Sequence, residues 1–309
     1  MSLMRSLFLN ASESAWLRDH ATRYGFMRRS LERFMPGERL SDALDAAKRL
    51  NVSGIFAVLT HLGENVKQRS EAEEVVRGYV GALEQIRAAN LSAEISVKLT
   101  QLGLDLDIEF CRANLMRIVE KSAPEKTVWI DMEHSPYVDA TLDIYRRVHE
   151  VHRNTGVCLQ AYLFRTERDL TSLISLGAAV RLVKGAYSEP PEIALAEKKD
   201  VDENFFRLAQ MLLAPDARAA SVRAAFATHD GTLIARISEW AAAQSISKNQ
   251  IEFQMLYGIQ RAEQVRLARE GCRSAVLVSY GSYWFPWFMR RMAERPANAF
   301  FVARNLFSG

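Results

Sequence analysis

The sequence lacks the features that mark disulfide-stabilised, zinc-stabilised and membrane-spanning proteins. Its only cysteines, Cys111, Cys158 and Cys272, lie far apart without CxxC spacing, so we expect no disulfide framework and no metal site. No run of about 18 apolar residues occurs, and the N-terminus shows no basic region followed by an apolar stretch and a cleavage site. We therefore expect a cytoplasmic protein, with peripheral contact to the inner face of a membrane left open.

A strong excess of charge of one sign is also absent. Forty basic and 37 acidic residues give a net charge of +3, which gives little reason to expect a nucleic-acid partner. The composition, 49% hydrophobic and 25% charged without low-complexity tracts, is typical of a globular chain that buries a large core. The length of 309 residues suits one β/α barrel of about 250 residues with an extension.

Short apolar or β-branched runs alternate with longer amphipathic stretches after the first 50 residues. Eight such runs are predicted to be strands, namely residues 54–59, 94–98, 127–131, 157–160, 180–184, 223–227, 250–254 and 274–278. Helical sequence follows each run, including 69–90 after the first and 283–296 after the last. Eight strand–helix units predict an α/β fold, a (β/α)8 TIM-type barrel. No GxGxxG follows the first strand, which disfavours a Rossmann fold.

The N-terminal part of the chain has a different pattern. Residues 1–50 are predicted to be a helical extension, with Ser12 and Ser41 as helix caps and a break at Pro36-Gly37. Residues 51–309 are then predicted to be the barrel domain, with the last helix at its C-terminal end.

Polar residues gather where the predicted strands end, which is where active sites lie in such barrels. A single polar group there is more often a helix cap or a loop charge. Together they are costly to bury unless a ligand satisfies them, so they predict a binding site for something large and polar. They include His61, Glu64, Lys98, Asp131, Glu133, Gln160, Tyr162, Arg181, Lys184, Thr228, His229, Asp230 and Gln254.

The last predicted helix places Trp287 one helical step from both Arg290 and Arg291. In one interpretation this is a core helix whose Arg290 pairs with Glu294 on the surface. In the other, the two guanidinium groups bind a carboxylate and the indole forms a wall beside an apolar ring.

Four segments in this order resemble the proline dehydrogenase family, in its short monofunctional bacterial form. They are RLVKGAY at 181–187, FATH at 226–229, EFQMLYG at 252–258 and MRRMAERPAN at 289–298. The resemblance runs from about Gly54 to Asn305. It implies a noncovalent FAD at the strand ends, oxidation of L-proline to 1-pyrroline-5-carboxylate by hydride transfer to flavin N5, and electron transfer to a membrane quinone.

The resemblance also implies roles for individual residues. Arg181 is expected near the flavin N5 and Gln160 near the isoalloxazine edge, with Val183, Lys184, Gly185, Ala186, Tyr187, Thr228 and His229 along the cofactor. Lys98, Arg290 and Arg291 are expected to hold the substrate carboxylate, and Asp131 to lie near the substrate. Glu64 is expected to pair with Arg290 and close the site.

The sequence departs from the family pattern around the expected substrate pocket. Leu277 and Trp287 stand where the family has tyrosines, Ser279 replaces a proline, and Thr60 stands where an aspartate is common. A hydrophobic pocket discriminates small ring substituents only weakly. Hydroxyproline or another substituted cyclic imino acid is therefore the main alternative to L-proline.

The residues are also compatible with two other classes of function. Lys98 or Lys184 would form a Schiff base in an aldolase built on the same barrel. A non-catalytic barrel that only binds is the third alternative.

Overall fold

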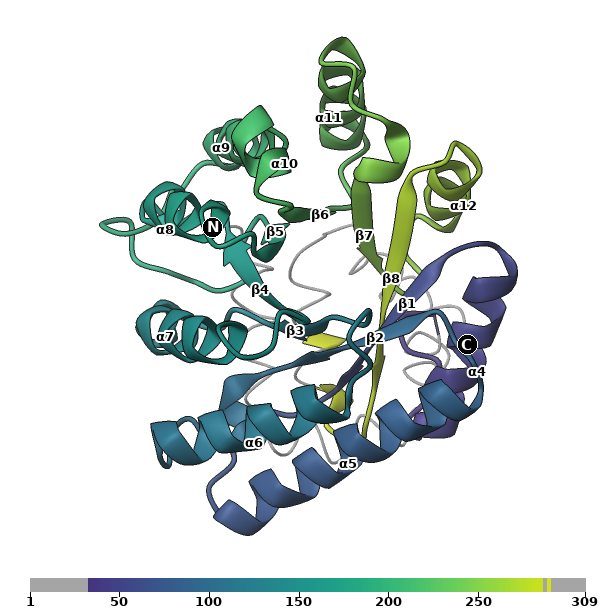
Figure 1. The fold of residues 1–309 in the computed structure, drawn as a ribbon, viewed down its shortest axis with the longest axis vertical. Helices are drawn as coiled ribbons and strands as arrows, with labels where there is room; N and C mark the ends of the chain where they lie inside the picture. The colour runs from purple at the N-terminus through teal and green to yellow at the C-terminus, as the bar shows by residue number, and fades with distance from the viewer. Residues whose placement is uncertain (1–32, 286–287, 290–309) are drawn as a thin grey trace, which may run out of the picture.

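The computed structural model describes residues 33–285 and 288–289, which form a closed barrel of parallel strands surrounded by helices (Figure 1). The chain order of the strands is also their order around the barrel, and β8 closes on β1 with Phe56 opposite Ala275 and His61 opposite Tyr280. The predicted (β/α)8 barrel is therefore confirmed. The strands are β1 (Phe56–His61), β2 (Ala93–Val97), β3 (Val128–Ile130), β4 (Thr155–Gln160), β5 (Ala179–Val183), β6 (Arg223–Ala227), β7 (Glu252–Leu256) and β8 (Arg273–Tyr280).

Helices follow the strands and form the outer ring seen in Figure 1. Asp107 caps α6 by accepting a hydrogen bond from the Phe110 N–H at 2.8 Å, and Asp230 caps α11 through the Thr232 N–H at 3.1 Å. The helices after β1 to β7 are α5 (Arg69–Ala88), α6 (Ile108–Lys121), α7 (Val138–His149), α8 (Thr166–Ile174), α9 (Lys198–Leu212), α10 (Pro215–Ala219), α11 (Gly231–Ala243) and α12 (Arg261–Arg269). Short 3-10 turns lie at η1 (Leu99–Leu102), η2 (Ser135–Tyr137) and η3 (Lys248–Gln250).

The helix that precedes the barrel, α4 (Leu40–Val52), completes the outer ring. It packs against both β1 and β8, the place that the helix after the last strand fills in a regular barrel. The prediction of Ser41 as its cap is wrong, because the helix already begins at Leu40. Arg39 and Asp42 close its first turn instead, with the Arg39 N–H donating to Asp42 Oδ2 at 3.0 Å. Ser12 lies outside the described residues.

The described start of the last helix rests on the segment before α4. Trp284 Nε1 donates to Glu38 Oε1 at 3.1 Å, and the Phe288 ring centre lies 6.3 Å from that of Phe34. Residues 33–39 therefore support the beginning of the helix on which the substrate-binding arginines are predicted.

Alternate strand residues face opposite sides of the barrel wall. Outward residues such as Ala57 and Leu59 join the large core beneath the helices. Inward residues form a second apolar cluster around Trp129, which is fully buried. Across the described ranges, no helix is both long and apolar enough to cross a bilayer.

Candidate active site

Three strands bring a compact group of charged and polar side chains to the C-terminal mouth of the barrel. Arg181 on β5 donates from Nη1 to Asp131 Oδ1 at 2.8 Å and to Ser96 Oγ at 2.9 Å. The Ser96 hydroxyl in turn donates to Asp131 Oδ1 at 2.7 Å. Lys98, directly after β2, places Nζ 3.5 Å from Asp131 Oδ2. The structure thus brings together Lys98, Asp131 and Arg181, three residues expected to act at one site.

Two of the expected cofactor residues at this mouth each carry a buried polar atom that has no hydrogen-bond partner among the described residues. One is the donor Arg181 Nη2, and the other is the acceptor Gln160 Oε1 at the end of β4. Both side chains are otherwise fixed, since Arg181 Nε donates to Gln254 at 2.7 Å and Gln160 Nε2 donates to the Glu133 carbonyl at 3.2 Å. Buried polar atoms are normally satisfied. A bound molecule with both an acceptor and a donor on one edge would complement this pair.

The end of β5 and the segment after it carry five of the expected cofactor residues. Lys184 Nζ lies 2.5 Å from Asp202 and 2.9 Å from Asp230, so α9 and the end of β6 fix its position. Gly185 has φ of +121°, and a Cβ added there would lie 2.3 Å from Tyr162 Cδ1. Only glycine fits this conformation without strain. The absence of a side chain at Gly185 therefore lets the Tyr162 ring lie directly against the backbone of this segment.

The rest of that segment is tied to the loop after β3. The Tyr187 ring centre lies 3.9 Å from that of His134. Glu189 accepts hydrogen bonds from Ser135 N at 2.8 Å and Ser135 Oγ at 2.6 Å. Of the other two expected residues, Val183 is half-buried and Ala186 is exposed. These contacts hold the segment over one side of the barrel mouth.

Thr228 and His229 follow β6 and are anchored locally. Thr228 is buried, and its hydroxyl accepts from the Asp230 N–H at 3.1 Å. His229 Nε2 accepts from the Leu256 N–H at 2.9 Å, so a neutral His229 carries its proton on Nδ1. Both residues therefore lie on the same rim as Lys184.

Glu133, two residues after Asp131, is buried beneath the loop that follows Lys98. Burial raises its pKa to about 7, although hydrogen bonds from Thr100 and the nearby charge of Lys98 act in the opposite direction. The Thr100 hydroxyl donates to Glu133 Oε2 at 2.6 Å and the Thr100 N–H to Oε1 at 3.1 Å. Glu133 thus ties the segment after Lys98 to the end of β3.

The structure describes only some of the residues expected to contact the substrate. Trp287, Arg290 and Arg291 lie outside the described residues, and with them the predicted pairing of Glu64 with Arg290. Glu64 itself is half-buried in the loop after β1. Leu277 packs against the apolar cluster inside the barrel and is partly buried.

Gln254 was predicted to lie on the polar rim without a named partner, and Ser96 and Glu252 were assigned no role. Ser96 and Gln254 bond to Arg181 directly, and Glu252 is connected to it through Gln254. Their signal was the alternation of strand residues, since Ser96 lies two positions before Lys98 and Glu252 two before Gln254. Alternation places residues on the inner face but does not say which of them meet across the barrel.

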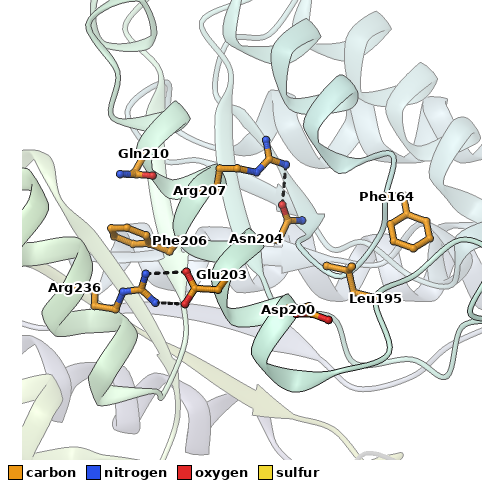
Figure 2. Close-up of a pocket in the computed structure, with 9 residues that line it drawn as sticks. All are labelled: Phe164, Leu195, Asp200, Glu203, Asn204, Phe206, Arg207, Gln210 and Arg236. Carbon is orange, nitrogen blue, oxygen red and sulfur yellow. Dashed lines mark hydrogen bonds and ion pairs between the residues drawn. The ribbon is translucent and has the colours of Figure 1, made fainter.

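A surface groove beside α9 and α11 is separate from this mouth (Figure 2). Its cations are already matched, because Arg236 donates to both carboxylate oxygens of Glu203 at 2.7 and 2.9 Å. Arg207 lies 2.6 Å from Glu167 and donates to Asn204 at 2.8 Å. Both arginines of the groove are therefore already engaged by protein side chains.

Comparison with known proteins identifies the family to which the chain is similar. The family model described as Proline dehydrogenase matches residues 43–304. Proline dehydrogenase 1 of Bacillus subtilis (strain 168) is 38% identical over 305 residues, 98% of this chain and 99% of that protein. Proline dehydrogenase of Deinococcus radiodurans is 36% identical over 284 residues, 90% of each chain.

A solved structure shares the fold. The crystal structure of proline utilization A (PutA) from Bdellovibrio bacteriovorus inactivated by N-propargylglycine superposes with a TM-score of 0.79 at 22% identity, over 94% of this chain and 36% of that one. The family is decided by the match to the family model and by the identity to the two bacterial proteins. The chain belongs to the proline dehydrogenase family.

Proposed function

We propose that this chain oxidises L-proline to 1-pyrroline-5-carboxylate with a bound FAD and passes the electrons to a quinone. Family membership supports the substrate, because the similar proteins of Bacillus subtilis and Deinococcus radiodurans are named as proline dehydrogenases. The observation that carries the cofactor is the pair of buried, unpartnered atoms, Arg181 Nη2 and Gln160 Oε1. When bound, FAD supplies the acceptor for the hydride that leaves the substrate.

The residues at the mouth fit a flavin. The edge of an isoalloxazine ring carries hydrogen-bond acceptors and one N–H donor, which are the partners that Arg181 Nη2 and Gln160 Oε1 require. We assign Arg181 to the region of N5 and Gln160 to the ring edge. The rest of the cofactor would lie along the rim formed by Val183, Lys184, Gly185, Ala186, Tyr187, Thr228 and His229.

Lys98 and Asp131 would act on the substrate. Lys98 supplies a cation for the proline carboxylate, together with Arg290 and Arg291 of the last helix. Hydride leaves the ring carbon beside nitrogen only when that nitrogen is uncharged. By holding the carboxylate, these residues would fix the ring with that carbon in position for hydride transfer. Asp131 would lie next to the substrate, held in place by its contacts with Lys98 and Arg181. Glu64 would close the site by pairing with Arg290.

The aldolase alternative is disfavoured by the surroundings of both lysines. Schiff-base formation requires a neutral amine. Lys98 faces Asp131, and Lys184 lies between Asp202 and Asp230. Each nitrogen is therefore already engaged by carboxylate oxygens, whereas an aldolase lysine must be free to attack the substrate carbonyl.

One observation favours a second substrate, hydroxyproline. Ser279 is buried, and its hydroxyl has no hydrogen-bond partner among the described residues. It lies on the same face of β8 as Leu277, two positions away. An unpartnered hydroxyl next to an altered pocket residue would suit a ring that carries a hydroxyl of its own.

The test is anaerobic reduction of the purified protein. We expect a yellow protein that releases FAD on denaturation and whose flavin band bleaches when L-proline is added. Faster bleaching by trans-4-hydroxy-L-proline would establish the second substrate instead. A protein without flavin, or one whose flavin neither imino acid reduces, would contradict the proposal and favour a barrel that only binds.

A further inference from the structure

A continuous column of polar contacts runs through the barrel interior from its N-terminal end to the active site. At the base, Glu94 and Glu252 are buried between Arg223 and Arg273. Trp129 forms the middle of the column. The guanidinium carbon of Arg223 lies 4.9 Å from the Trp129 ring centre, and the guanidinium carbon of Arg181 lies 4.6 Å from it. Arg181 forms the top and belongs to the candidate site. The base network therefore reaches the candidate site through side chains alone.

A second connection in this column determines the direction of one amide. Gln254 donates from Nε2 to Glu252 Oε1 at 2.6 Å, and its Oε1 accepts from Arg181 Nε at 2.7 Å. A carboxylate only accepts hydrogen bonds and a guanidinium only donates them. The amide of Gln254 therefore has one favourable orientation, with nitrogen toward Glu252 and oxygen toward Arg181.

We propose that Glu252 is a positioning residue for Arg181, acting through the amide of Gln254. The inference rests on the proposed function, in which Arg181 binds FAD. Glu252 lies two positions nearer the base of the barrel than Gln254 and touches only the base network and Gln254 among the contacts described here. Its effect on the cofactor is therefore indirect.

Replacing Glu252 with glutamine tests this orientation. Both oxygens of Glu252 accept from Arg223, Oε1 from Nη2 at 3.0 Å and Oε2 from Nε at 2.9 Å. An amide nitrogen at either position would oppose an arginine N–H. Where the new nitrogen faces Gln254, the Gln254 amide turns over and presents its own nitrogen to Arg181 Nε. The hydrogen bond to Arg181 Nε is then lost, and among the described residues only Ser96 and Asp131, at Nη1, still hydrogen-bond to the guanidinium.

Glu94→Gln is a matched control. Glu94 is as buried as Glu252 and accepts from the same Arg223, at 2.7 and 3.0 Å. It makes no contact with Gln254 among those described, and one of its oxygens remains in the variant to accept from Trp129 Nε1. Gln254→Leu is a second variant, which removes the connection and leaves the arginines of the base in place.

The experiment is equilibrium dialysis of the holoprotein, with the visible spectrum of the retained flavin as a second readout. We expect Glu252→Gln and Gln254→Leu to bind FAD at least about tenfold more weakly than wild type and to shift its absorption, while Glu94→Gln stays within about twofold. Equal FAD affinity in Glu252→Gln and Glu94→Gln would overturn the inference. If Glu252→Gln does not fold, wild-type affinity in Gln254→Leu would overturn it. A wild-type protein that binds no FAD would overturn the proposed function itself.

Discussion

Replacing Glu133 with glutamine should remove a pH dependence from the stability of the protein. Burial raises the pKa of this carboxyl group from an ordinary 4.5 to about 7, so the folded state holds the proton more tightly than the unfolded state does. The protonated carboxyl group therefore contributes to the free energy of unfolding. This contribution is complete below the pKa of Glu133 in the unfolded state and is lost as the pH rises through its pKa in the folded state. A pKa difference of this size corresponds to about 3 kcal/mol.

The assay is urea unfolding of wild type and Glu133→Gln at several pH values between about 5 and 8. Glutamine can still accept from the Thr100 N–H, so the variant should fold. As the pH rises across this range, the free energy of unfolding of wild type should fall by about 3 kcal/mol relative to that of Glu133→Gln.

Glu94→Gln again serves as the control. Burial raises the Glu94 pKa, but the charges of Arg223 and Arg273 together with hydrogen bonds from Arg223 and Trp129 lower it below its ordinary value, so Glu94 is ionised in both states above about pH 6. Its variant should differ from wild type by an amount that hardly changes with pH. If the free energies of unfolding of Glu133→Gln and wild type change in parallel from pH 5 to 8, the raised pKa of Glu133 is refuted.

Three further outcomes are expected. Arg223→Met should destabilise the fold by about 3 kcal/mol in urea unfolding, because two buried glutamates lose their main partner; a loss below about 1 kcal/mol would contradict this. Gly185→Ala, whose Cβ would lie 2.3 Å from a tyrosine ring, should cost about 1–3 kcal/mol, whereas Gly81→Ala in α5, where a Cβ has open space, should be neutral or stabilising. Leu277→Tyr should change the ratio of kcat/KM for L-proline and trans-4-hydroxy-L-proline by about tenfold, and an unchanged ratio would remove Leu277 from the specificity pocket.

Much of the fold could be predicted because the sequence alternates between two periodicities. Each predicted strand lies on an observed one, but the ends differ, as at β8, which extends to Tyr280. Strand ends depend on pairing with neighbours, and β8 is lengthened by its pairing with β1 out to His61. Periodicity in one segment carries no information about that partner.

The position of α4 could not be predicted for a similar reason. Its apolar face indicates that it packs on something, and only the closed barrel shows that this is the gap between β8 and β1.

The candidate site was predicted best where a residue lies at a strand end. Lys98, Asp131 and Arg181 were expected there, and they are in contact. Ser96 and Glu252 were missed because their importance comes from contacts across the barrel interior. Those contacts depend on how the strands are staggered when the barrel closes.

The most direct test of the central claim compares product formation by wild type, Lys98→Met and Lys48→Met over a range of L-proline concentrations. Lys48 is an exposed lysine of α4 paired with Asp45, so its variant controls for loss of a positive charge. The account predicts that wild type and Lys48→Met form 1-pyrroline-5-carboxylate alike. In Lys98→Met, KM should rise by roughly 30-fold or more, since a charged hydrogen bond to the carboxylate is worth about 2–3 kcal/mol. Wild-type KM in Lys98→Met, or no product from any of the three proteins, would contradict it.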